Sequence, residues 1–295
     1  MEYVIETNGL TKKYGEKCAV NSASVHVRKG DIYGLIGKNG AGKTTLMKAL
    51  LGLTVPNGGE IKLFGSSDLN AARKKIGSLI EAPAIFKNET AFENMKRFSL
   101  LAPTSDDDIK RILDLVGIGN TGSKKAGAFS LGMKQRLGIA IALLGNPEIL
   151  ILDEPINGLD PAGIKEVRDI IVGLNHKGIT FMISSHILDE LGKIATNYGI
   201  MNDGVLEEIS AEELAAKSRA ALVVKTDDGL KAAEILRQAF PDLTVISDGD
   251  KVEITSAVSD ASVINKTLVS ANVGVYELKE VNVSFEDYFI ERLGR

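Results

Sequence analysis

The segment Gly37–Thr44, with the sequence GKNGAGKT, constrains this chain most, because it fits the pattern G-x-x-x-x-G-K-[ST] at every fixed position. Its glycines let backbone N–H groups turn toward a phosphate, Lys43 brings positive charge, and the Thr44 hydroxyl can bind Mg²⁺. The mostly apolar run 31–36 predicts a buried strand before the segment, and the helix formers at 45–51 predict a helix after it. A phosphate would then lie at a helix N-terminus, so the pattern predicts a phosphate-binding loop in an α/β fold.

The composition narrows the classes of protein that this chain can belong to. A length of 295 residues suits one large α/β domain plus a smaller one, and the net charge of −4 disfavours a nucleic-acid-binding protein. The single cysteine, Cys18, cannot form an internal disulfide. No apolar run approaches the ~18 residues that span a bilayer, and the N-terminus lacks a secretion-signal pattern. We expect a cytoplasmic protein that reaches a membrane only through a partner.

Two acids follow a fully apolar run that predicts a central parallel strand, Ile149–Leu152. Asp153 and Glu154 then lie at the carboxyl end of that strand, where open α/β sheets bind ligands. In a phosphate-loop enzyme, Asp153 can hold Mg²⁺, and Glu154 can orient or deprotonate an attacking water. The alternative is a strand that ends in a solvated acid pair, but the position after a phosphate loop favours the catalytic interpretation.

His186 stands just past the next predicted buried strand, Thr180–Ser185, on the same ligand-binding edge. It is a candidate for sensing the γ-phosphate or for orienting the attacking water. A lone histidine is more often structural, and that is the interpretation for His26 and His176.

Tyr14 is an aromatic residue on a predicted turn shortly before the phosphate loop. Strands at Tyr3–Thr7 and Ala23–Val27 predict a front sheet, with Leu10–Gly15 turning between them. An aromatic ring on that turn can stack on an adenine, since offset stacking is favourable. Packing at a strand end explains Tyr14 equally well at this stage.

The rest of the chain predicts a helical insertion and a second domain. Helical periodicity between residues 84 and 145 indicates a helical subdomain, and Ser130–Gly132 at a helix N-terminus is a weak candidate for a second anion site. We expect the first domain to cover 1–217. The order β-α-β-β-α-β over 218–295, ending in a helix at Phe285–Leu293, predicts a small α+β ferredoxin-like domain for regulation or assembly.

Over residues 3–210 these motifs, in this order, resemble the ATP-binding subunit of an ABC transporter. Gly37–Thr44 matches the Walker A motif, Phe129–Met133 the signature, Ile149–Glu154 the Walker B motif with its catalytic glutamate, Asn157–Asp160 the D-loop, and His186 the switch histidine. The fold implied is a P-loop NTPase of the ABC ATPase type, with a parallel core sheet, an antiparallel front sheet and a helical subdomain. The implied reaction is ATP hydrolysis coupled to transport.

The resemblance also implies a role for each matching residue, with ATP and Mg²⁺ as cofactors. It assigns catalysis to Glu154 and His186, and the D-loop position to Asp160. The implied metal ligands are Thr44, Glu81 and Asp153. The implied ATP-binding residues are Tyr14, Gly37, Lys38, Asn39, Gly40, Ala41, Gly42, Lys43, Thr44 and Thr45. The signature residues that would hold ATP of an opposite chain are Ser130, Leu131, Gly132 and Met133.

Two positions depart from the family pattern. The signature is FSLGM in place of LSGGQ, so Leu131 and Met133 replace a glycine and a glutamine. The loop that usually carries a glutamine carries Glu81, whose carboxylate would bind Mg²⁺ more strongly but adds negative charge beside phosphate. Coupling to a transmembrane partner is expected to differ there.

Three segments resemble one subgroup, the bacitracin-resistance and lantibiotic self-protection ATPases. They are Glu81–Pro83, the stretch FSLGMKQRL at 129–137, and Phe285–Phe289. This resemblance implies a homodimer or heterodimer of ATPase subunits on the inner face of the cell membrane, bound to an integral membrane permease that exports a peptide antibiotic, with no nucleic acid involved.

Other readings of the motifs stay open. An ABC-2 type exporter of another cargo, such as a lipid, a drug or an ion, is the nearest alternative. A soluble ABC ATPase acting on DNA or ribosomes needs coiled-coil arms or two cassettes, and the sequence has neither. A small-molecule P-loop kinase leaves Ser130–Met133 and His186 unexplained.

Overall fold

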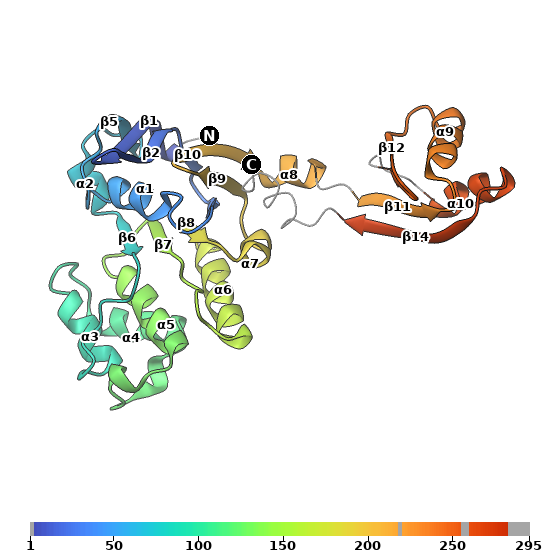
Figure 1. Ribbon diagram of the computed structural model, residues 1–295. Helices are drawn as coiled ribbons and strands as arrows, with labels where there is room; N and C mark the ends of the chain where they lie inside the picture. The colour runs from blue at the N-terminus through green and yellow to red at the C-terminus, as the bar shows by residue number, and fades with distance from the viewer. Residues whose placement is uncertain (1–2, 218–219, 255–259, 283–295) are drawn as a thin grey trace. The chain divides into compact units, whose positions relative to one another are not determined.

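The computed structural model describes residues 3–217, 220–254 and 260–282 (Figure 1). The chain divides into two compact units, Met1–Ala211 and Glu212–Arg295. Helix α8 (Ala211–Lys217) thus lies almost wholly in the second unit, whereas a boundary between 217 and 218 would leave it in the first.

A six-stranded sheet with the order β10-β9-β4-β8-β7-β6 forms the centre of the first unit. Its strands are β4 (Ile32–Ile36), β6 (Ile76–Leu79), β7 (Ile149–Asp153), β8 (Thr180–Ser185), β9 (Asn197–Asn202) and β10 (Val205–Ser210). All neighbours run parallel except β10 beside β9, and every residue of β4, β7 and β8 is buried. Because parallel strands end at one edge, the residues that follow β4, β7 and β8 meet there.

A second, antiparallel sheet contributes to the same core. It consists of β1 (Tyr3–Tyr14), β2 (Lys17–Ala23), β3 (His26–Arg28) and β5 (Gly58–Leu63). The predicted turn at Leu10–Gly15 is wrong, because residues 10–14 pair with β2 and the chain turns only at Gly15 and Glu16. Tyr14 therefore ends a strand, opposite Lys17.

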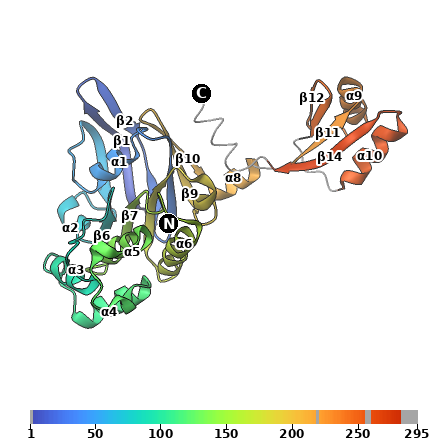
Figure 2. The same ribbon diagram turned by 60° about the horizontal axis from the view of Figure 1, so that its bottom comes forward.

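Helices complete the first unit. The phosphate loop leads into α1 (Lys43–Leu50), and α2 (Leu69–Arg73), α6 (Pro161–Asn175) and α7 (Leu188–Gly192) follow β5, β7 and β8. Between β6 and β7 lie α3 (Ala91–Phe98), α4 (Asp106–Leu115) and α5 (Leu131–Ala142), which contact one another (Figure 2). Ser105 caps α4 by accepting a hydrogen bond from the Asp108 N–H, and three acids occupy its first turn.

The second unit folds as a small sandwich. Its elements are β11 (Ala220–Thr226), α9 (Gly229–Ala239), β12 (Val245–Asp248), β13 (Lys251–Ile254), α10 (Ala261–Ser270) and β14 (Val275–Asn282). The sheet order β12-β13-β11-β14, antiparallel throughout, is the ferredoxin-like topology that the sequence predicted. The predicted helix Phe285–Leu293, and the matching segment Phe285–Phe289, lie outside the described residues.

A carboxylate on β10, Glu208, bonds a buried tyrosine and links the two sheets of the first unit through His26. The Tyr33 hydroxyl on β4 donates a hydrogen bond to Glu208 Oε1 on β10 at 2.8 Å. The same carboxylate accepts the backbone N–H of His26 at 2.9 Å and lies 2.7 Å from its Nδ1, which gives His26 a structural partner. Burial, followed by the charge of Glu208, raises the pKa of Tyr33 well above its ordinary value.

The raised pKa of Tyr33 predicts a loss of stability at alkaline pH. The unfolded chain ionises above about pH 10 while folded Tyr33 keeps its proton, so its contribution is full below that pH and is lost as pH rises. We expect Tyr33→Phe to reduce the fall of unfolding free energy between about pH 9 and 11, by up to ~1.4 kcal/mol per pH unit, in urea titrations. The control is Tyr14→Phe, whose ring is 51% exposed. Equal slopes in Tyr33→Phe and the parent would contradict this account.

Candidate nucleotide-binding site

The loop between β4 and α1 is held in one conformation by packing and by its own lysine. Gly42 precedes α1 with φ +115°, and a Cβ there would lie 2.1 Å from the Ala19 carbonyl oxygen, so only glycine fits. Lys43 is buried and its Nζ donates to the carbonyl oxygens of Gly37 at 2.6 Å and Lys38 at 3.3 Å. The loop therefore curls around the lysine ammonium, as phosphate binding requires.

A pocket opens over this loop. It is lined by Tyr14, Lys17, Ala19, Asn39, Gly40, Gly42, Lys43, Thr44, Thr45 and Glu154. The pocket therefore joins the strand-end tyrosine, the helix N-terminus and one strand-end acid, which are far apart in the sequence.

Asp153 and Thr44 offer hard oxygen ligands side by side. Thr44 Oγ1 donates to Asp153 Oδ2 at 2.7 Å, and the carboxylate is buried. Oxygen donors of this kind suit Mg²⁺, which keeps several waters and takes its other ligands from phosphates. The pair fits that ion: Thr44 and Asp153 would hold it, and the ion would supply charge neutralisation between phosphate oxygens.

Ser184 on β8 positions both strand-end acids, and sequence reasoning missed it. Its Oγ donates to Asp153 Oδ1 at 2.5 Å and accepts the Glu154 backbone N–H at 2.8 Å. The parallel pairing of Asp153 with Ser184 in the β7–β8 register creates this contact. A hydroxyl within an otherwise apolar predicted strand was the available indication.

Glu154 faces the pocket in a strained backbone conformation. Its φ of +49° is left-handed, which a non-glycine residue adopts at a cost of order 1–3 kcal/mol and mostly at functional sites. Oε2 lies 2.7 Å from His186 Nδ1, and Oε1 lies 3.4 Å from Lys43 Nζ. Oε1 is buried and accepts no hydrogen bond from any described residue, so it is free to take one from a water or hydroxyl.

Tyr14 lies at the rim of the pocket with an exposed ring. Lys12 Nζ sits 4.8 Å from the ring centroid and donates to the Val55 carbonyl oxygen at 2.7 Å, while the Tyr14 hydroxyl lies 3.4 Å from Thr54 Oγ1. These contacts orient a ring that borders the pocket at the end of β1.

Glu81 has a cation as its partner. Its Oε1 lies 2.6 Å from Lys48 Nζ on α1, and its own backbone is left-handed at φ +61°. The hydrogen bond with Glu81 is the main cause that raises the pKa of Lys48, and the charges of Tyr14 and Asp153 add to it. Lys48 is thus the direct partner of the Glu81 carboxylate.

The signature residues lie apart from this pocket. Ser130 caps α5 by accepting the Met133 N–H at 3.2 Å, and none of Ser130, Leu131, Gly132 and Met133 lines the pocket. The exposed Leu131 instead lies against Gly158 in the D-loop, which ends at Asp160, the cap of α6. The signature and the phosphate loop are therefore separate in one chain.

Comparison with known proteins decides the family. The family described as "ABC transporter" matches residues 20–157. The bacitracin transport ATP-binding protein BcrA of Enterococcus faecalis is 41% identical over 100% of this chain and 97% of its own length. The lantibiotic transport ATP-binding protein SrtF of Streptococcus pyogenes is 45% identical over 68% of this chain and 88% of its own length.

Solved structures of ATP-binding cassettes are also similar to this chain. The ADP conformation of MJ1267, an ATP-binding cassette of an ABC transporter, has a TM-score of 0.67 at 26% identity and covers 74% of this chain and 94% of its own. The chain belongs to the ATP-binding subunits of ABC transporters. As an ABC ATPase, it binds and hydrolyses ATP, and subunits of this family dimerise and work with membrane permeases. Among the described residues, the helices are all too short or too polar to cross a bilayer.

Removal of the Ser184 hydroxyl should damage the ATPase site. In Ser184→Ala, Asp153 loses a donor and the Glu154 N–H loses its acceptor, so we expect kcat to fall about ten-fold and the unfolding free energy by ~1–3 kcal/mol. Steady-state ATPase assays and thermal unfolding measure the two effects. Ser99→Ala is the matched control, because Ser99 is also buried and bonds only the Lys96 carbonyl oxygen at 2.8 Å. An unchanged kcat in Ser184→Ala would show that Ser184 does not support the ATPase site.

Proposed function

We propose that this ABC ATPase forms a dimer around two ATP molecules and drives a separate permease that exports a peptide antibiotic, giving resistance or self-protection. The observation that carries the proposal is the pocket in which Lys43, Thr44 and Glu154 meet while Ser130 faces elsewhere. The relatives named for bacitracin and lantibiotic transport support the cargo. An exporter of a lipid, a drug or an ion is the alternative.

Each residue takes a role that its contacts support. Lys43 and the N–H groups of Gly40–Thr45 hold the phosphates, and Tyr14 stacks on the base. Thr44 and Asp153 would ligate Mg²⁺, while Glu81 is bonded to Lys48 on α1. Ser130 and Gly132 of a second chain close the site, with Asp160 at the same interface.

Hydrolysis then depends on the Glu154–His186 pair. Glu154 Oε1 has no hydrogen-bond donor among the described residues and takes the proton of the attacking water, while His186, 2.7 Å from Oε2, orients the carboxylate. Closure of the dimer moves the helical region, and the segment from Glu81 to Phe98 passes this movement to the permease. The subunit would then work at the cytoplasmic face of the membrane, attached through that permease.

Glu154→Gln separates binding from hydrolysis. Glutamine keeps the shape and the hydrogen bond toward His186 but cannot accept the proton, so we expect ATP binding and a trapped dimer with turnover reduced about 10³-fold. Light scattering during gel filtration detects the dimer, and phosphate release measures turnover. The matched control is Glu148→Gln, at the opposite end of β7, whose carboxylate pairs with Lys75 at 2.9 Å. Turnover at the parent rate in Glu154→Gln would refute the assignment.

The cargo is tested in a sensitive host that expresses the chain together with a partner permease. We expect the lowest inhibitory concentration of bacitracin or of a purified lantibiotic to rise several-fold, and Lys43→Ala to abolish the rise because the phosphates lose their cation. Protection against a small drug or a membrane-active ion carrier, without protection against either peptide, would favour the alternative cargo.

A further inference from the structure

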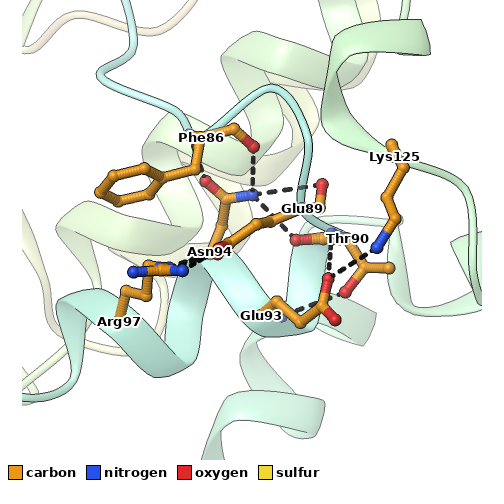
Figure 3. A network of polar contacts seen from close by, with 7 residues as sticks. All are labelled: Phe86, Glu89, Thr90, Glu93, Asn94, Arg97 and Lys125. Carbon is orange, nitrogen blue, oxygen red and sulfur yellow. Dashed lines mark hydrogen bonds and ion pairs between the residues drawn. The ribbon is translucent and has the colours of Figure 1, made fainter.

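A network of polar contacts around Asn94 holds the loop Phe86–Thr90 (Figure 3). Asn94 lies on α3 and is 0% exposed. Its Oδ1 accepts the Phe86 N–H at 2.7 Å, and its Nδ2 donates to the carbonyl oxygens of Thr90 at 2.8 Å and Phe86 at 3.1 Å. The carboxamide therefore uses its acceptor and both its N–H groups to fix the two ends of the loop.

The same loop is bonded to a second segment, Lys125–Ala128. Ala126 N–H donates to the Glu89 carbonyl oxygen and Gly127 N–H to that of Lys87, both at 2.7 Å. A Cβ at Gly127 would lie 2.9 Å from the Lys87 carbonyl oxygen, so glycine permits this approach.

Charged side chains reinforce the junction. Glu93 Oε2 accepts the Thr90 N–H at 2.7 Å and lies 3.1 Å from Lys125 Nζ, as Figure 3 shows. The hydrogen bond from the Thr90 backbone, followed by that from Lys125, lowers the pKa of Glu93 to about 2. Glu93 is therefore charged at neutral pH and holds both sides of the junction.

The second segment leads directly into the signature. Phe129 is buried and its N–H donates to the Ala126 carbonyl oxygen at 3.2 Å, and Ser130 follows as the cap of α5. At the other end of the network, the Phe86 ring is 46% exposed, with the Arg97 guanidinium 4.9 Å from its centroid. The hydrogen bonds thus connect the backbone of Phe86, whose ring is exposed, to Phe129, the residue directly before Ser130.

We propose that Glu93, Asn94 and Lys125, here called the Asn94 clamp, are positioning residues that fix the signature Ser130 to the Phe86 loop so that the two move as one body. The proposal rests on the proposed function, in which Ser130 contacts ATP bound to a second chain. A partner that binds at Phe86 then changes the stability of the ATP-bound dimer without contacting the phosphate loop at Lys43.

The test uses full-length Glu154→Gln protein. It measures the hydrogen exchange of the signature amides in the single chain and the ATP concentration at which the dimer forms. We expect Lys125→Gln and Gly127→Ala to speed hydrogen exchange of the amides at 129–134 in the single chain by about five-fold. We also expect both to raise by about five-fold the ATP concentration that gives half-maximal dimer, with the ADP affinity of the single chain unchanged. Lys125→Arg should restore the parent values.

Two controls match these variants. Lys110→Gln removes an exposed lysine that pairs with Asp107 at 3.3 Å elsewhere in the helical region, and Gly173→Ala adds a methyl group in α6 with no atom within 4 Å. Unchanged hydrogen exchange at 129–134 in both test variants would overturn the clamp. An ADP affinity that falls by the same factor as the ATP concentration for half-maximal dimer rises would also overturn it. If the parent forms no ATP-dependent dimer, the proposed function fails, while the exchange rates still support or overturn the clamp.

Discussion

The hydrogen bonds that Ser184 makes across β7 and β8 are the contact on which the ATPase site depends. One hydroxyl donates to Asp153 and accepts the Glu154 N–H, so the two acids at the end of β7 share one anchor. The strained backbone of Glu154 is held by this anchor, and its side chain is turned away from the sheet toward Lys43 and His186. A parallel sheet with both strands buried provides the rigid frame for this arrangement.

Much of this could be predicted, for identifiable physical reasons. Strand β7 begins with the apolar run Ile149–Leu152 and β8 contains the apolar run Phe181–Ile183, as expected of strands in a sheet covered on both faces. The acids and His186 follow those runs, so their meeting at one edge required only that the strands be parallel. The ferredoxin-like order of the second unit followed in the same way from alternating strand and helix patterns.

What could not be predicted depends on contacts between distant segments. Ser184 matters only because the register sets it opposite Asp153, and register cannot be read from a short apolar run. The turn expected at Leu10–Gly15 failed because pairing with β2 extends β1 to Tyr14, and such pairing overrides local turn propensity. The ion pair of Glu81 with Lys48 joins residues 33 positions apart, so the sequence left only the choice between metal ligand and repulsive charge.

The contacts of Leu131 give a structural account of one departure from the signature pattern. Leu131, where the family pattern has glycine, packs its side chain against Gly158 of the D-loop in the same chain. The substitution thus adds an apolar contact between α5 and the loop before α6. The segment before the signature is bonded to the Phe86–Thr90 loop through Ala126 and Gly127. In the proposed dimer the signature would therefore be supported both by that loop and by the D-loop.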